Sequence, residues 1–122
     1  MSNLTASLED YLEIIFNNTN DSKKIRAIDI SKELKVSRAS VTEALKKLEL
    51  KGFINYGRYE ALSLTDSGKE VAEKIVSKHK ILQTFFEKIL GLSQEEASVN
   101  ACKIEHVITD NAFVKIAEYL AK

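Results

Sequence analysis

Residues 37–52 read SRASVTEALKKLELKG, and this stretch decides the fold. Ser37 is a favourable N-cap residue, and Gly52 is a residue that favours a helix end. Between them, apolar residues recur with the spacing of one helix face, at Val41, Ala44, Leu45 and Leu48. The pattern predicts a helix that runs from the Ser37 cap through Lys51 and buries one side.

The residues before Ser37 predict two more helices. Ser7, with Asp10 three positions later, is close to a capping box with a shorter acid, so we expect a first helix to begin there. Residues 25–34 predict a short second helix, and the two residues after it form a tight turn. A short helix, a tight turn and a capped helix in this order predict a helix-turn-helix.

The spacing of the apolar residues changes after Gly52. Residues 53–56 and 61–64 predict two short strands, which residues 57–60 would join as a hairpin. A hairpin directly after a helix-turn-helix predicts a winged helix-turn-helix, a fold that places one helix in the major groove of DNA.

Further helices are predicted after the wing. Thr65 caps a long helix over residues 66–90, and Gly91 ends it. Ser93, followed three positions later by Glu96, is a capping box for the next helix.

A last helix begins near the C-terminus, where either Thr109 or Asp110 is the cap. The 122 residues hold no proline and four glycines, a composition that favours helices with few breaks. The expected fold class is mostly α with a small β-hairpin wing.

Charge is unevenly spread although the formal net charge is zero. Residues 23–58 hold ten Lys or Arg against four Asp or Glu, a net charge of +6, which favours an anionic partner. The third helix begins with small polar residues around one arginine, so it suits close approach to base edges. The candidate DNA-contacting residues are Ser37, Arg38, Ala39, Ser40, Thr42 and Glu43, with Lys46, Lys47 and Arg58 for phosphates. The plainer alternative is a helical domain with a basic surface.

A second set of residues predicts a metal site. Residues 102–106 read CKIEH, and they use the only cysteine and one of the two histidines. At i, i+3 and i+4, Cys102, Glu105 and His106 share one helix face and offer three metal-ligand types. Three ligands are too few for a divalent ion. Further candidates are Asp10 and Glu13 on the first helix and His79 on the long helix.

Each candidate ligand has a plainer interpretation. Asp10 and Glu13 alone are typical of a solvated acidic first turn. His79 lies between two lysines, which is typical of a surface position, and Cys102 alone is typical of a small core residue. Cys102 and His106 as a catalytic pair is a further alternative, but no oxyanion-hole loop accompanies them.

The chain resembles the diphtheria toxin repressor and manganese transport regulator family of metal-dependent transcriptional repressors. The resemblance covers nearly the whole length and rests on residues 9–13 (EDYLE), 36–48, 64–68 (LTDSG), 78–80 (KHK) and 102–107 (CKIEHV). It implies a winged helix-turn-helix DNA-binding domain at residues 1–72 and a helical metal-binding and dimerisation domain at residues 73–122. It also implies a homodimer that binds a palindromic operator in double-stranded DNA.

The resemblance also implies a ligand set. The manganese-type members are matched at Asp10, Glu13, His79, Glu105 and His106. These members have a glutamate at the position of Cys102, whereas iron-type members have a cysteine there and a methionine at the position of Asp10. A second iron-type site would need acidic and histidine partners near Gln83 and Ser98, which this sequence lacks. The mixed donors leave Fe²⁺ and Mn²⁺ both open, with Zn²⁺, Co²⁺ or Ni²⁺ as surrogates.

The expected function is a metal-dependent DNA-binding repressor of metal homeostasis genes, activated by Fe²⁺ or Mn²⁺. The alternative is a metal-independent winged-helix regulator switched by a small molecule or a partner protein. We do not expect an enzyme, because no loop-borne acid, base or nucleophile is present. A single cysteine, no signal-peptide pattern and no membrane-length apolar run predict a cytoplasmic protein without a membrane partner.

Overall fold

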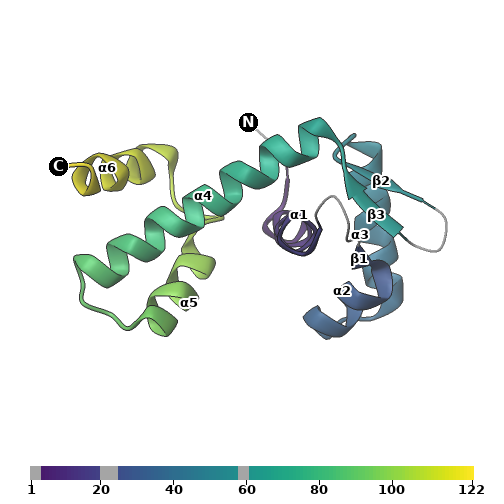
Figure 1. Ribbon diagram of the computed structural model, residues 1–122, viewed down its shortest axis with the longest axis horizontal. Coiled ribbons are helices and arrows are strands. Elements are labelled where there is room, and N and C mark those ends of the chain that lie inside the picture. The colour runs from purple at the N-terminus through teal and green to yellow at the C-terminus, as the bar shows by residue number, and fades with distance from the viewer. Residues whose placement is uncertain (1–3, 20–24, 58–60) are drawn as a thin grey trace. The chain divides into compact units, whose positions relative to one another are not determined.

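The computed structural model describes residues 4–19, 25–57 and 61–122, and the chain divides into two units, Met1–Glu73 and Lys74–Lys122 (Figure 1). Helix α4 begins in the first unit and continues into the second. The elements in chain order are α1 (Ala6–Asn18), β1 (Ile25–Arg26), α2 (Ala27–Leu34), α3 (Arg38–Leu50), β2 (Ile54–Tyr56), β3 (Ala61–Leu64), α4 (Asp66–Lys88), α5 (Gln94–Ile104) and α6 (Asp110–Leu120).

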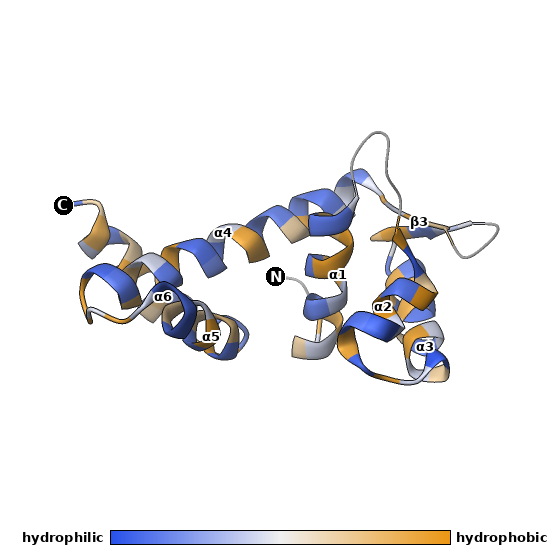
Figure 2. Cartoon of the chain, turned by 60° about the horizontal axis from the view of Figure 1, so that its bottom comes forward, coloured by the Kyte–Doolittle hydropathy of each residue, from blue (hydrophilic) through white to orange (hydrophobic). Residues whose placement is uncertain are grey.

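The first unit is built around one hydrophobic core. Helices α1, α2 and α3 each carry a band of hydrophobic residues (Figure 2), and the sheet closes the core. Burial also raises the pKa of the Tyr11 phenol above its ordinary value, because the charged form loses its hydration. The largest fully buried side chains of this unit are Leu12, Ile15, Ile30, Val41, Leu45, Leu48, Ile54 and Leu62.

The helix-turn-helix follows from local hydrogen bonds. Lys35 takes a left-handed conformation with φ of 57°, and its backbone N–H donates to the carbonyl of Ser31, which ends α2. The Ser37 hydroxyl then accepts a hydrogen bond of 3.1 Å from the Ser40 N–H and starts α3. Gly52, with φ of +81°, follows the end of α3. The predicted cap, helix and stop are confirmed.

The sheet has three antiparallel strands in the order β1-β3-β2. Strands β2 and β3 form the predicted wing, with Ile54 opposite Leu64. The prediction of helix over residues 25–34 is wrong for its first two residues, which form β1 and place Ile25 opposite Leu62. The cause is tertiary, because Ile25 is buried by pairing with a distant strand. Arg58 lies outside the described residues.

Two threonines set the starts of their helices. The first helix begins at Ala6, earlier than predicted, because the Thr5 hydroxyl rather than Ser7 accepts a hydrogen bond of 3.2 Å from the Leu8 N–H. The Thr65 hydroxyl accepts a hydrogen bond of 3.0 Å from the Gly68 N–H and donates one of 2.7 Å to the Gly52 carbonyl. Thr65 therefore caps α4 as predicted and also ties its start to the end of α3.

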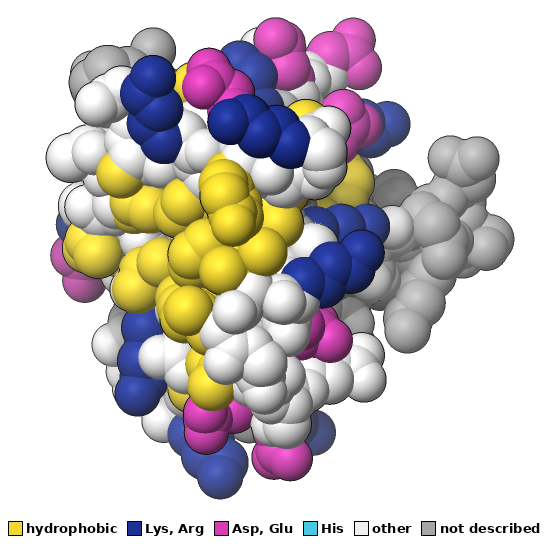
Figure 3. Space-filling model, turned by 90° about the vertical axis from the view of Figure 1, so that its left-hand side faces the viewer, with side chains coloured by type: hydrophobic (Ala, Val, Ile, Leu, Met, Phe, Trp, Pro, Cys, Tyr) yellow, Lys and Arg dark blue, Asp and Glu magenta, His cyan; other side chains and the backbone are white. Residues whose placement is uncertain are grey.

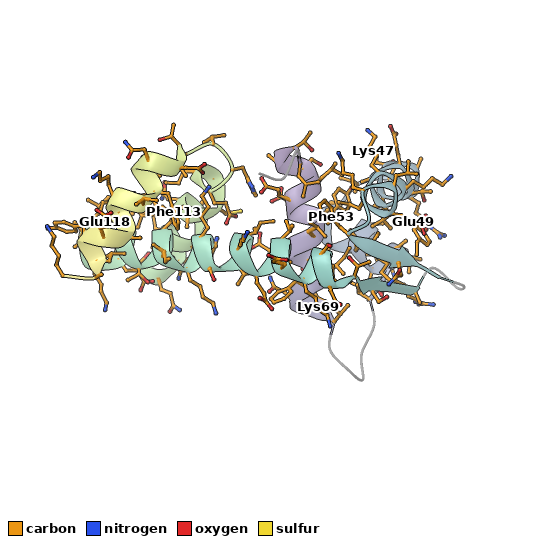
Figure 4. All side chains as sticks on the ribbon, turned by 90° about the horizontal axis from the view of Figure 1, so that it is seen from above. Lys47, Glu49, Phe53, Lys69, Phe113 and Glu118 are labelled. Atoms are coloured by element: carbon orange, nitrogen blue, oxygen red, sulfur yellow. The ribbon has the colours of Figure 1, made fainter. Side chains whose placement is uncertain are left out.

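The second unit contains the later turns of α4 with α5 and α6. Ser93 caps α5 and Thr109 caps α6, as each hydroxyl accepts a backbone hydrogen bond. The ammonium of Lys78 on α4 lies 5.5 Å from the ring centre of Phe113 on α6, a cation–π contact (Figure 4 labels Phe113). Among the residues described, no helix is long and apolar enough to cross a bilayer.

The core of the second unit is thin. Helix α6 has no buried residue. In the described part of this unit, the buried hydrophobic residues are Ile75, Leu82, Ala97 and Ala101, two of which are alanines. Larger hydrophobic side chains are exposed instead, and Figure 3, which faces this unit, shows hydrophobic side chains gathered in one patch with charged side chains around it. The exposed residues are Ile89, Leu90, Val99, Val107, Val114 and Tyr119.

Candidate metal centre and DNA-reading helix

The predicted ligands near the C-terminus lie at the end of α5. We expected Cys102, Glu105 and His106 within one helix, but α5 ends at Ile104 and His106 follows in a turn. Glu105 is the C-cap, and its N–H donates to the Ala101 carbonyl at 3.0 Å. The helix ends here because the chain must turn before the Thr109 cap of α6.

Glu105 is a buried carboxylate between two imidazoles. Its side chain is 1% exposed, and those of His79 and His106 are 19% and 8% exposed. The Nδ1 atom of His79 lies 3.5 Å from one carboxylate oxygen, and the Nε2 atom of His106 lies 3.6 Å from the other. His79 is therefore not the surface residue of the plainer interpretation, and α4 and α5 bring three candidate ligands together.

Cys102 lies beside the same carboxylate. Its sulfur is within 4.8 Å of a Glu105 oxygen, as the i, i+3 spacing predicts. The thiol is exposed, so the interpretation of Cys102 as a small core residue is wrong for this chain. A thiol and two imidazoles thus each lie close to the Glu105 carboxylate in the second unit.

This arrangement fits a divalent transition metal. Two donors held about 2.1 Å from one ion at a tetrahedral angle are about 3.4 Å apart, close to the spacing of each imidazole nitrogen from its carboxylate oxygen. The buried carboxylate is costly without a compensating positive charge, which a divalent ion would supply. Imidazole, carboxylate and thiolate together suit the later first-row metals and remain compatible with Fe²⁺ and Mn²⁺.

The remaining predicted ligands lie in the first unit. Asp10 and Glu13 are both on α1, one turn apart and half-buried. Their carboxylates share the helix with the buried residues Leu8, Tyr11, Leu12 and Ile15. The spacing therefore presents two oxygen donors on one part of α1, as predicted.

Helix α3 presents the predicted DNA-reading residues at its N-terminal end. Ser37, Arg38, Ala39 and Ser40 are exposed, as are Glu43, Lys46 and Lys47, and Thr42 is half-buried. Lys47 pairs with Glu43 at 3.6 Å across one helical turn, so part of its charge is already compensated. Figure 4 shows Lys47 projecting from α3. Small exposed residues at the start of a helix allow its backbone to approach the groove floor.

Ser98, which the sequence identified only as lacking the donor of a second iron-type site, lies beside His79. Its hydroxyl oxygen lies 3.4 Å from the Nε2 atom of His79. The two residues are on different helices, and no spacing pattern links them. The sequence signal was limited to the periodicity of α5, which places Ser98 one turn before Cys102.

Known proteins resemble this chain in both of its parts. Residues 3–62 match the N-terminal DNA-binding domain of iron-dependent repressors, and residues 65–122 match their metal-binding and dimerisation domain. An HTH-type transcriptional regulator of Methanocaldococcus jannaschii is 35% identical over 98% of this chain and 96% of its own length. The transcriptional regulator MntR of Bacillus subtilis is 32% identical over 93% of this chain and 80% of its own.

This chain belongs to the diphtheria toxin repressor and manganese transport regulator family. Members of the family are metal-dependent transcriptional repressors with a DNA-binding domain and a metal-binding, dimerising domain. The predicted fold, family and DNA partner are confirmed, as is the expectation of a regulator rather than an enzyme.

Solved structures give the same fold. A manganese-dependent transcriptional repressor in complex with manganese superposes with a TM-score of 0.83 at 29% identity, over 93% of this chain and 52% of that one. The IdeR protein of T. acidophilum superposes with a TM-score of 0.82 at 25% identity, over 100% of this chain and 56% of that one. The chain spans about half the length of these two solved proteins.

Proposed function

We propose that this protein represses metal homeostasis genes in the cytoplasm and binds its operator when Fe²⁺ or Mn²⁺ is bound. The observation that carries the proposal is the buried Glu105 carboxylate between the imidazoles of His79 and His106, in a member of a metal-dependent repressor family. Zn²⁺, Co²⁺ or Ni²⁺ would act as surrogates, because the same donors bind them.

Six side chains would hold the metal. His79, Glu105 and His106 supply imidazole and carboxylate donors, and Cys102 supplies a thiolate. Asp10 and Glu13 add two carboxylates from α1. With these ligands in both units, metal binding would favour one arrangement of the DNA-reading helices over others, which makes the metal an allosteric ligand. The ligands proposed are Asp10, Glu13, His79, Cys102, Glu105 and His106.

The exposed hydrophobic patch of the second unit supports a homodimer. Four buried hydrophobic residues among those described, two of them alanines, are a weak core, and larger side chains such as Val107, which is 74% exposed, remain in water. A second copy would cover this patch and complete the core. The two α3 helices of such a dimer would read half-sites of a palindromic operator about 34 Å apart.

The DNA contacts would divide into two classes. Arg38, among small residues at the start of α3, would contact base edges and supply sequence preference. Lys46, about two helical turns further along, would contact phosphate and supply affinity. We propose the same phosphate role for Lys47 and Arg58, and a place at the groove for Ser37, Ala39, Ser40, Thr42 and Glu43.

Selection of DNA by the full chain tests the proposal. A library of random duplexes is incubated with the protein in Mn²⁺, in Fe²⁺ without oxygen, and in a chelator. We expect one palindromic sequence to be enriched with metal and lost with chelator. Equal enrichment in chelator would instead identify a metal-independent regulator switched by another ligand.

A further inference from the structure

The two ring nitrogens of His79 face different partners. Nδ1 lies 3.5 Å from a Glu105 oxygen, and Nε2 lies 3.4 Å from the hydroxyl oxygen of Ser98 on α5. Nδ1 is buried and has no hydrogen-bond partner among the described residues. The nitrogen that faces the carboxylate is thus the one placed to bind a metal, and Ser98 holds the other end of the ring.

A neutral imidazole binds a metal through the nitrogen that carries no proton. If Nδ1 of His79 is the ligand, the proton must reside on Nε2, where it needs a hydrogen-bond acceptor. The Ser98 hydroxyl has acceptor lone pairs and is within reach. The same hydroxyl can also rotate and donate to Nε2 when the proton resides on Nδ1 beside Glu105.

We propose that Ser98 is a positioning residue for the metal site, which holds the His79 ring in place and accepts the Nε2–H hydrogen bond when Nδ1 binds the ion. This inference rests on the proposed role of His79 as a ligand. A hydroxyl suits this position because it can accept a hydrogen bond from a protonated Nε2 or donate one to an unprotonated Nε2. The ring of His79 therefore keeps its orientation in either tautomer. An acceptor-only or donor-only side chain would favour one tautomer alone.

The surroundings of Ser98 support this role over a purely structural one. Ser98 and His79 line an open groove of the second unit with Gln83, Glu95 and Cys102. Gln83 already donates a hydrogen bond of 3.1 Å to Glu87, so its amide N–H is directed elsewhere. Ser98 is half-buried within α5, where alanine has the higher helix propensity. A serine at this position therefore does not serve the stability of the helix.

The test compares Ser98→Ala with Ser98→Thr in the full chain. Zn²⁺ is the probe, since it is diamagnetic, and two quantities are measured: Zn²⁺ affinity, and the side-chain ¹⁵N shifts of His79. We expect Ser98→Ala to lose on the order of tenfold in affinity and to shift the Nε2 resonance of zinc-bound His79, because its N–H loses its acceptor. Ser98→Thr keeps the hydroxyl and should keep both. Thermal unfolding in chelator should be no lower for Ser98→Ala than for the parent.

Three outcomes are decisive. If Ser98→Ala keeps the parent affinity and the parent nitrogen shifts, the positioning role is overturned. It is also overturned if Ser98→Thr loses as much as Ser98→Ala. His79→Ala separates this failure from that of the proposed ligand set, because unchanged Zn²⁺ affinity in that variant would remove His79 as a ligand and the inference with it.

Discussion

The Nδ1 atom of His79 on α4 lies 3.5 Å from the carboxylate of Glu105 at the end of α5. This contact joins two helices of the second unit through a carboxylate whose side chain is 1% exposed. A buried carboxylate is disfavoured unless positive charge compensates it, and a bound metal would supply that charge. A metal bound at this contact would therefore stabilise this unit.

Glu105→Gln should weaken metal binding while preserving the shape of the side chain. A lost ligand costs tenfold or more in affinity, and each tenfold loss removes about 1.4 kcal/mol of the stabilisation that metal confers. The measurement is thermal unfolding with and without Mn²⁺. Glu96→Gln, an exposed position on the same helix, is the matched control and should respond to Mn²⁺ like the parent. An unreduced Mn²⁺ response in Glu105→Gln would remove Glu105 from the site.

Cys102→Glu should move metal preference toward Mn²⁺ and away from Co²⁺ and Zn²⁺, because an oxygen donor is harder than sulfur. Titration with each metal measures the preference. The parent bound to Co²⁺ should also show a thiolate-to-metal charge-transfer band that the variant lacks. If the parent shows no such band and the variant keeps the parent preference, the thiolate is not a ligand.

Arg38→Ala should reduce the sequence preference of DNA binding, whereas Lys46→Ala should reduce the affinity for all DNA. Losing a base contact at Arg38 should cost about 1 to 3 kcal/mol of discrimination between operator and unrelated DNA. Losing a phosphate contact at Lys46 should weaken binding to all DNA and lower the salt slope by about one unit. Anisotropy titrations at several salt concentrations measure both. A specific-to-nonspecific ratio unchanged by Arg38→Ala would contradict the assigned register of α3.

Gly68→Ala should destabilise the first unit. A Cβ at this position would collide with the backbone carbonyl of Phe53, which also accepts a hydrogen bond of 3.1 Å from the Thr65 N–H. The carbonyl cannot move without breaking that bond, so we expect a loss of about 3 kcal/mol, at the upper end for overpacking. Urea unfolding measures it. Gly57→Ala is the control, since its Cβ would make an ordinary contact of 3.6 Å; equal losses in both variants would rule out the collision.

Local signals explain why much of the first unit could be predicted from the sequence. The Ser37 cap, the apolar face of α3 and Gly52 act within a few residues of one another, so the pattern alone specifies the helix. Strand β1 could not be predicted in this way. Its two residues pair with β3, and the register of Ile25 with Leu62 depends on the folded core.

The candidate metal site also combines a local feature that the sequence predicts with tertiary contacts that it does not. The i, i+3 spacing placed Cys102 beside Glu105, because that relation is local to α5. The burial of Glu105 and the approach of His79 depend on how α4 packs against α5, which periodicity does not encode. The contact of Ser98 with His79 also depends on how α4 packs against α5.

The most direct measurement of the central claim is operator affinity as a function of free Mn²⁺, for the parent and for His106→Ala, with light scattering to establish that both are dimers. The duplex is the one recovered by selection. We expect Mn²⁺ to raise the parent's affinity by about 5- to 150-fold, the usual range of allosteric coupling. His106→Ala should bind like the chelator-treated parent at every Mn²⁺ concentration. Parent affinity that is equal in Mn²⁺ and in chelator, or an undiminished Mn²⁺ response in dimeric His106→Ala, would contradict the account.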